Sequence, residues 1–294
     1  MQWCTVKNSY PKIFVFLCQV MGSPNKYLNS QKIKLLLQMK SSEKFTVKIE
    51  NLAEEPYDEV LCYPKPDEVE VKKRIAELKE LGVESLEFTG GKRVSNVPVL
   101  GKGCVGIVVV AHLKSGERVA LKIRRVDADR VNMKHEAEML AKANDVGVGP
   151  KLLTSTDNFL LMQYIEGELF PEWLNKTEDV DLIRRVLREL FEQCFRLDNV
   201  GLDHGELSNA SKHLIITENG KPYIIDFETA SANRRTANLT SLAQYLLIKK
   251  PISNKIHEKI GKIDTKQLIE ALREYKKEKS EENFEKVLKV CKLT

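Results

Sequence analysis

The sequence lacks an apolar run of about 18 residues, the length at which a membrane-spanning helix becomes a candidate, so no such helix is expected. Its six cysteines are scattered without a C-x-x-C pair, which argues against a structural zinc site and against a disulfide scaffold. A reducing, cytoplasmic location is the simplest expectation. Hydrophobic residues make up 42% of the chain and charged residues 30%, which is typical of a globular protein with one large core or two smaller lobes.

The net charge of +5 does not indicate a nucleic-acid surface on the main body of the chain. Residues 1–38 hold five lysines and no acidic residue, and the two signs balance over residues 39–294. Residues 249–294 carry 13 Lys or Arg against 8 Asp or Glu, a pattern typical of solvated helices. We therefore expect neither a nucleic-acid partner nor a membrane partner.

The basic segment 1–38 is expected to lie outside the fold. It contains one short apolar run, residues 13–21, which follows lysines as in a signal peptide. Gln19 interrupts the run, however, and no clear cleavage site follows. The alternatives are an amphipathic or poorly ordered extension and a translation start at Met39.

The body of the chain divides into a strand-rich half and a helical half, which predicts an α+β fold in two lobes. Residues 39–94 are expected to form an N-terminal cap, with a helix capped by Asp67. The small lobe is expected at 95–166 and the helical lobe at 167–294. Apolar periodicity predicts a strand at 85–88 in the cap. In the small lobe it predicts strands at 97–100, 107–113, 118–123 and 160–165 and a helix from Asp127 or Asp129 to Asn144.

In the helical half, Thr177 is expected to cap a long helix, and an Asn219-Gly220 turn is expected to join two strands. The expected strands lie at 213–216 and 223–226, and further helices are expected at 238–248, 265–279 and 281–291.

Three glycines, Gly101, Gly103 and Gly106, form a G-x-G-x-x-G string. The same string marks dinucleotide-binding folds, but there it opens a helix. Here the β-branched run 107–110 follows, which predicts a glycine loop within a β-hairpin. Such a loop lets backbone amides approach phosphate oxygens without interference from Cβ atoms.

A single lysine, Lys122, ends the apolar string Val119-Ala120-Leu121-Lys122. A strand lysine behind a glycine hairpin can hold its ammonium against phosphates if a carboxylate keeps it in place. The following helix offers Glu136 and Glu138, of which only one can face the lysine.

The order of these features, followed by a hinge strand at 161–167, a long helix, a loop and an Asp-Phe pair, resembles a protein kinase over residues 95–248. The chain is most similar to an archaeal family of predicted serine/threonine protein kinases, and it also resembles the minimal atypical kinases, namely the RIO kinases and the small kinase of the KEOPS complex. The resemblance implies a bilobal fold with a small β-rich N-lobe and a reduced, mostly helical C-lobe. It also implies ATP with Mg²⁺ or Mn²⁺ and phosphoryl transfer to a hydroxyl group.

The resemblance also implies roles for individual residues. Glu136 would be the ion-pair partner of Lys122, with Glu138 as the alternative. The hinge would be at Gln163 and Ile165, and Asp226 would be the metal ligand that bridges the phosphates. The residues expected to contact ATP are Gly101, Lys102, Gly103, Cys104, Val105, Gly106, Val108, Val109, Lys122 and Glu136.

The catalytic loop departs from the H-x-D-x-x-x-x-N pattern of kinases. It starts at His204, places Glu206 where the hydroxyl-orienting Asp is expected, and places Ser211 where the second metal ligand, an Asn, is expected. A glutamate keeps the carboxylate and a similar ordinary pKa, but its extra methylene moves the oxygens by more than about 1 Å. Asn209 or His213 could replace Ser211, although structural roles are preferred for both.

The usual Asp-Phe-Gly triplet reads Asp226-Phe227-Glu228. Loss of the glycine removes backbone freedom at this point, and Glu228 is expected to face solvent. Only a short segment follows before the next helix, and no A-P-E string occurs, so a peptide-docking platform is not expected. The pair Arg234-Arg235 could bind an anion, but a surface role is preferred.

These residues predict an atypical ATP-dependent protein kinase that phosphorylates Ser or Thr, including its own residues, on an unknown protein substrate. Glu206, Lys122 and Asp226 are the expected catalytic residues, and Asp226 and Ser211 the expected metal ligands. The alternatives are a pseudokinase that acts as a nucleotide-binding partner module, a small-molecule kinase and a RIO-like ATPase of ribosome assembly.

Overall fold

The computed structural model describes residues 44–294, so the predictions made for residues 1–38 lie outside the described range. The strand-rich half is built on one seven-stranded antiparallel sheet in the order β1-β2-β6-β7-β9-β8, with β5 paired to β6. Its strands are β1 (Phe45–Lys48), β2 (Val83–Phe88), β5 (Gly101–Lys102), β6 (Gly106–Leu113), β7 (Arg118–Arg124), β8 (Leu152–Ser155) and β9 (Phe159–Gln163). The apolar and β-branched strands β6 and β7 lie inside the sheet, as their sequences favour.

The segment expected as a cap extends this sheet, because β1 pairs with β2 and β2 pairs with β6. Its helix α5 (Glu68–Glu80) begins where the sequence predicts, since the Asp67 carboxylate accepts the backbone N–H groups of Val69 and Glu70. The segment also holds the short helices η1 (Ile49–Asn51) and α4 (Tyr57–Leu61). Its last strand, β3 (Lys92–Val94), forms a hairpin with β4 (Val97–Val99).

A buried arginine ties α5 to the sheet. Arg74 is fully buried and donates to the backbone oxygens of Leu61 and Arg124, at 2.7 and 2.6 Å, and to Asn158 Oδ1 at 3.1 Å. Asn158 in turn donates to Glu77 of the same helix. Because a buried guanidinium needs such partners, residues 44–94 share one polar network with the strands that follow them.

The helix α6 (Lys134–Asp145) begins later than the sequence predicts. The Asp127 carboxylate does not cap it but accepts two hydrogen bonds from the Arg125 guanidinium, at 2.8 and 2.7 Å. The Asn132 side chain accepts the backbone N–H of Lys134 instead. The expected start at Asp127 or Asp129 is therefore wrong.

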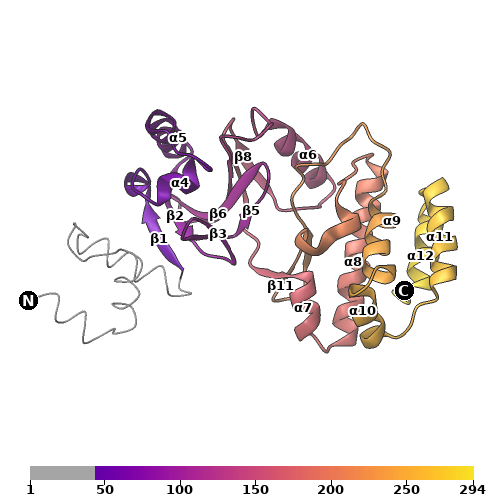
Figure 1. Cartoon of the computed structure of the whole chain (residues 1–294). Helices are drawn as coiled ribbons and strands as arrows, with labels where there is room; N and C mark the ends of the chain where they lie inside the picture. The colour runs from indigo at the N-terminus through magenta and orange to yellow at the C-terminus, as the bar shows by residue number, and fades with distance from the viewer. Residues whose placement is uncertain (1–43) are drawn as a thin grey trace, which may run out of the picture. The chain divides into compact units, whose positions relative to one another are not determined.

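The second half is mostly helical, which confirms the expected α+β class. It contains α7 (Phe170–Lys176), α8 (Val180–Asn199), the 3-10 helix η2 (Leu207–Lys212), α9 (Asn238–Ala243), the π-helical turn η3 (Gln244–Ile248), α10 (Ile252–Ile260), α11 (Thr265–Lys277) and α12 (Glu281–Val290) (Figure 1). A small antiparallel sheet joins β10 (Gly167–Leu169), β11 (Leu214–Thr217) and β12 (Pro222–Ile224). Of the helices in residues 44–294, none combines the length and apolar character needed to span a membrane.

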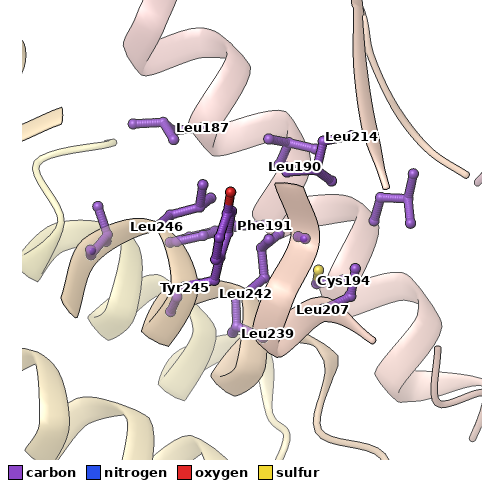
Figure 2. Packing of buried hydrophobic residues seen from close by; sticks show 14 of the residues in the cluster. Leu187, Leu190, Phe191, Cys194, Leu207, Leu214, Leu239, Leu242, Tyr245 and Leu246 are labelled. Carbon is purple, nitrogen blue, oxygen red and sulfur yellow. The ribbon is translucent and has the colours of Figure 1, made fainter. Parts of the chain in front are cut away.

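The cap of α8 differs from the prediction. The Asp179 carboxylate, and not the Thr177 hydroxyl, accepts the first backbone N–H groups of α8, whereas Thr177 ends the preceding helix α7. One face of α8 is buried: its residues Leu187, Leu190 and Phe191 pack with apolar side chains of α9 and η3 (Figure 2).

A buried carboxylate joins three helices of this half. Asp198 of α8 accepts hydrogen bonds from the backbone and side-chain N–H groups of Asn238, from the backbone N–H of Leu239, and from the Tyr275 hydroxyl at 2.9 Å. Tyr275 lies on α11, so the C-terminal helices share a hydrogen-bond network with the helices that surround the catalytic loop.

Candidate active site

The glycine loop is a tight turn between β5 and β6. The backbone N–H of Gly103 donates to the oxygen of Gly106 at 2.9 Å. At Gly106 a Cβ atom would lie 2.9 Å from the oxygen of Ile123 and 3.0 Å from Cγ of Lys122. Glycine is therefore required at position 106, because the side chain of Lys122 passes directly over it.

Two basic residues of the loop region stack on an aromatic ring that the sequence analysis did not single out. Lys102 Nζ lies 4.1 Å from the centroid of the Tyr63 ring, and Arg125 Cζ lies 4.8 Å from it. Arg125 also donates from its guanidinium to the oxygen of Gly103 and from its backbone to that of Val105. Tyr63, which lies before the loop in the sequence, thus stabilises the loop region through cation–π contacts.

The pleat of the sheet separates the two valines expected at the nucleotide. Val108 is the register partner of Lys122, so the two side chains share one face. Val109 is fully buried on the opposite face. Of the expected hinge residues, Gln163 is exposed at the end of β9 and its side chain accepts the backbone N–H of Lys151, while Ile165 is buried.

Three carboxylates surround the ammonium of Lys122. Its Nζ lies 2.8 Å from Glu136, 2.9 Å from Asp226 and 2.8 Å from Glu228. Burial alone would lower the pKa of Lys122, but the attraction of the three carboxylates outweighs it and raises that pKa, so the group stays charged. Burial raises the pKa of Glu136 even with Lys122 beside it. Burial would raise the carboxyl pKa of Asp226, but the attraction of Lys122 outweighs it and lowers that pKa.

The ion pair of Lys122 is made with Glu136, whereas Glu138 is exposed. Glu228 was expected to face solvent, and the structure contradicts this, because its side chain is only 14% exposed and binds Lys122. The backbone explains the difference: Asp226 has a positive φ of 70°, in the left-handed region. With this backbone conformation the Phe227 side chain is buried, and the Glu228 carboxylate lies beside the Lys122 ammonium.

The first histidine of the catalytic loop is a packing residue. His204 is fully buried, and its Nε2 lies 3.0 Å from the oxygen of Ile225. Its ring packs edge-on against Phe227, with centroids 5.0 Å apart. Burial lowers the pKa of His204 to about 4, so the imidazole is neutral near pH 7.

The arginine pair after the Asp-Phe motif is engaged within the protein. Arg234 forms an ion pair with Asp203 at 2.6 Å and donates to the backbone oxygen of Thr229. Arg235 donates to the oxygen of Lys276. Both residues are exposed, as the preferred surface role predicts, and their guanidinium groups also join neighbouring segments.

His213 lies between the carboxylates of Glu206 and Asp226. Its Nε2 lies 3.1 Å from Oε2 of Glu206, and its Nδ1 lies 3.8 Å from Oδ2 of Asp226. Ser211, expected as the second metal ligand, lies half-buried within η2. His213 directly precedes β11, two positions later than the kinase spacing indicates, which is why the motif pointed to Ser211.

Comparisons with known proteins bear on the family of the chain. Residues 110–246 match the RIO domain family. The chain is 32% identical over 118 residues to an uncharacterized protein of Methanocaldococcus jannaschii, an alignment that covers 40% of this chain and 99% of that protein. It is 29% identical over 164 residues to the Bacillus subtilis protein named "Putative serine/threonine-protein kinase YrzF", covering 55% of this chain and 73% of that protein.

Proposed function

Because the chain belongs to the RIO-type family of atypical, protein-kinase-like phosphotransferases, we propose that it transfers the γ-phosphoryl group of ATP to Ser or Thr hydroxyls of a protein, its own included. The observation that carries the proposal is the ammonium of Lys122, which Glu136 holds at 2.8 Å behind the glycine loop. A fixed positive charge beside the backbone amides of a glycine turn suits the phosphates of a nucleotide.

Binding of ATP would change the partners of Lys122. An ammonium has three N–H donors, and Lys122 already contacts three carboxylates. Glu136 is almost fully buried and remains the fixed partner, whereas Asp226 and Glu228 approach from a different segment of the chain. Phosphate oxygens would replace one or both of these two carboxylates on Lys122.

The donor set around Asp226 fits a divalent cation. Its Oδ1 contacts Lys122, and its Oδ2 faces the buried Nδ1 of His213, which has no hydrogen-bond partner. In our proposal Asp226 holds Mg²⁺ or Mn²⁺, which when bound would neutralise negative charge on the phosphates.

Glu206 is the proposed proton acceptor. Its side chain is 37% exposed, so a substrate hydroxyl can reach one carboxylate oxygen while the other lies beside His213. An ionised carboxylate at this point can orient the hydroxyl and take its proton as the phosphoryl group moves.

A second candidate function is a pseudokinase that binds a nucleotide without transferring phosphate. The observation that favours it is the complete set of carboxylate partners on Lys122, with which any nucleotide must compete. Intact Lys122 and Asp226 favour the enzyme.

The deciding experiment is phosphate transfer from γ-labelled ATP, with Mg²⁺ or Mn²⁺, to the protein itself and to an added mixture of basic proteins. Wild type is compared with Asp226→Asn and Glu206→Gln. Glu138→Gln is the matched control, because Glu138 lies on the same helix as Glu136 but is exposed. ATP binding is followed in parallel by calorimetry.

We expect label on Ser or Thr with wild type and with Glu138→Gln. Transfer should fall by about 100-fold or more in Asp226→Asn and Glu206→Gln while both proteins stay folded. ATP binding without transfer in wild type would reject the kinase and support the pseudokinase. Unchanged transfer in Glu206→Gln would reject Glu206 as the proton acceptor.

A further inference from the structure

One buried nitrogen near the site has no partner. His213 is only 8% exposed, and its Nδ1 is shielded from solvent without a hydrogen bond. An unpaired polar atom in such surroundings costs free energy, which indicates that a partner is missing. The nearest acidic oxygen is Oδ2 of Asp226, at 3.8 Å.

This distance does not fit a direct hydrogen bond but fits a shared cation. An N–H···O bond spans about 2.7–3.2 Å between the heavy atoms, which 3.8 Å exceeds. Two atoms that each lie about 2.1 Å from one metal ion can be up to about 4.2 Å apart. His213 Nδ1 and Asp226 Oδ2 are therefore spaced as two ligands of one ion.

Two groups of possible metal ligands meet at Asp226, and they differ in one respect. In the group Glu136, Asp226 and Glu228, the ammonium of Lys122 already supplies a cation to all three carboxylates. In the group Glu206, His213 and Asp226, the ligand atoms lie within 4.8 Å of one another, and within the described range no lysine or arginine is paired with Glu206 or with His213. The second group is the one that calls for an external cation.

Backbone hydrogen bonds and a ring contact hold His213 in this place. Its N–H donates to the oxygen of Ala210, and its own oxygen accepts the N–H of Ile225 at 2.9 Å, next to Asp226. The ring also packs edge-on against the neutral imidazole of His204, with centroids 5.5 Å apart. The imidazole is thus positioned without needing a metal, as a preformed ligand should be.

We propose that His213 Nδ1 and Asp226 are two ligands of one divalent cation, beside the Glu206 carboxylate, and that the imidazole of His213 replaces the expected oxygen ligand, so that the site prefers Mn²⁺ over Mg²⁺. An imidazole nitrogen is a softer donor than a carboxylate or amide oxygen, and first-row transition ions accept it far more readily than Mg²⁺ does. The inference rests on the proposed function in that both use Asp226 as a metal ligand.

The site is tested with the metal ion alone, without nucleotide. Mn²⁺ is titrated into the full-length protein, and the signal of free Mn²⁺ is followed by electron paramagnetic resonance; Mg²⁺ is then added as competitor. The variants are His213→Ala and His213→Asn. His112→Ala is the matched control, because His112 also contacts a carboxylate, Glu87 at 2.9 Å, but lies on β6 away from the group.

We expect one tightly bound Mn²⁺ in wild type and in His112→Ala, displaced only by a large excess of Mg²⁺. His213→Ala should weaken Mn²⁺ binding by about 10-fold or more, the usual effect of altering a metal site. His213→Asn, which offers an amide oxygen, should reduce the preference for Mn²⁺ over Mg²⁺. Equal Mn²⁺ affinity in wild type and His213→Ala would overturn the proposal.

A second measurement uses only the wild-type protein, so it remains valid even if the His213 variants fail to fold. Pulsed electron paramagnetic resonance of the wild-type complex detects the nuclear spin of a nitrogen bound directly to Mn²⁺. A strong nitrogen coupling supports the site, and its absence at saturating Mn²⁺ overturns it. A nitrogen coupling to Mn²⁺ without phosphate transfer would reject the proposed function but support the metal site. Phosphate transfer without a nitrogen coupling would support the proposed function but reject the metal site.

Discussion

The Glu228 carboxylate lies 2.8 Å from the Lys122 ammonium, the same distance as the helix residue Glu136. The third residue of the Asp-Phe-Glu triplet is thus a direct partner of the lysine. This contact spans 106 positions of the sequence and links the strand β7 to the loop that follows β12. Any anion that binds Lys122 must take the place of this carboxylate or share the ammonium with it.

Glu228→Gln should therefore strengthen ATP binding. The substitution removes a negative charge that competes with phosphate for Lys122, and we expect a decrease in the Kd for ATP of about 3- to 10-fold. Calorimetry without divalent cations measures it, with Glu218→Gln, an exposed glutamate of the β11–β12 turn, as control. Weaker binding in Glu228→Gln would show that this carboxylate assists the nucleotide instead.

Lys122→Met should destabilise the fold as well as any activity. It leaves Glu136, of which only 3% is exposed, without its counter-charge, and breaking a buried pair in this way costs about 3–5 kcal/mol. Urea unfolding measures the loss. The double variant Lys122→Met/Glu136→Met should regain much of it, since no buried charge is then left unpaired at that position. A fully stable Lys122→Met would contradict the structural role of the pair.

Gly106→Ala should impair nucleotide binding more than stability. The new methyl group would meet the backbone oxygen of Ile123 and the side chain of Lys122, which must then move. Gly91→Ala is the matched control, because no atom lies within 4 Å of a Cβ there. Binding of a fluorescent ATP analogue and thermal unfolding separate the two effects. Equal binding by both variants would argue against a close path of Lys122 over the loop.

Asp198 should give the unfolding free energy a specific pH dependence. Burial raises its carboxyl pKa above the ordinary value of 3.8, despite hydrogen bonds that favour the charged form. The folded protein therefore holds this proton to higher pH than the unfolded chain does, and the contribution of Asp198 to stability decreases as pH rises from about 3.8 through the folded pKa.

Asp198→Asn should remove this pH-dependent component. It should also lower the free energy of unfolding at neutral pH by about 1–3 kcal/mol, because the amide nitrogen that replaces one carboxylate oxygen cannot accept the hydrogen bond from Tyr275 or those from Asn238. Denaturant unfolding at several pH values measures both effects. The exposed Asp145→Asn serves as control. An identical pH profile in wild type and Asp198→Asn would refute the assignment.

Cys104 should be the most reactive of the four cysteines in residues 44–294. It lies exposed in the glycine loop, whereas burial raises the pKa of Cys62 to about 11 and that of Cys291 to about 12 and also raises that of Cys194. Iodoacetamide at pH 8 followed by peptide mass spectrometry should modify Cys104 in the native protein and the other three only after unfolding. Protection of Cys104 by ATP would support nucleotide binding at the loop.

The parts of the site that are close in sequence or set by strand pairing were predictable. The glycine string fixed the hairpin, and the register of that hairpin brings Val108 opposite Lys122. The helical period indicated that only one of Glu136 and Glu138 can face the sheet, and the resemblance to protein kinases implied the choice of Glu136. In each case a local rule agrees with the tertiary packing.

The remaining contacts depend on distant segments. Tyr63 and Arg74 support the small lobe from a region that carries no motif, and nothing in their local sequence marks their contacts. The expectation that Glu228 faces solvent is wrong because the left-handed backbone at Asp226 is not visible in the sequence. His213 was considered only as an alternative, because the spacing of a family motif was given more weight than the start of the strand.

The pairing of β2 with β6 has a consequence for fragments of the chain. β6 is an eight-residue, largely apolar strand, and without residues 44–94 one side of it would expose its unpaired backbone groups over the stretch that β2 now covers. Such an edge is a template for intermolecular pairing and aggregation. In residues 44–294 the outer position instead belongs to the four-residue β1, flanked by Lys44 and ending in Lys48, the short and charged edge that resists such association.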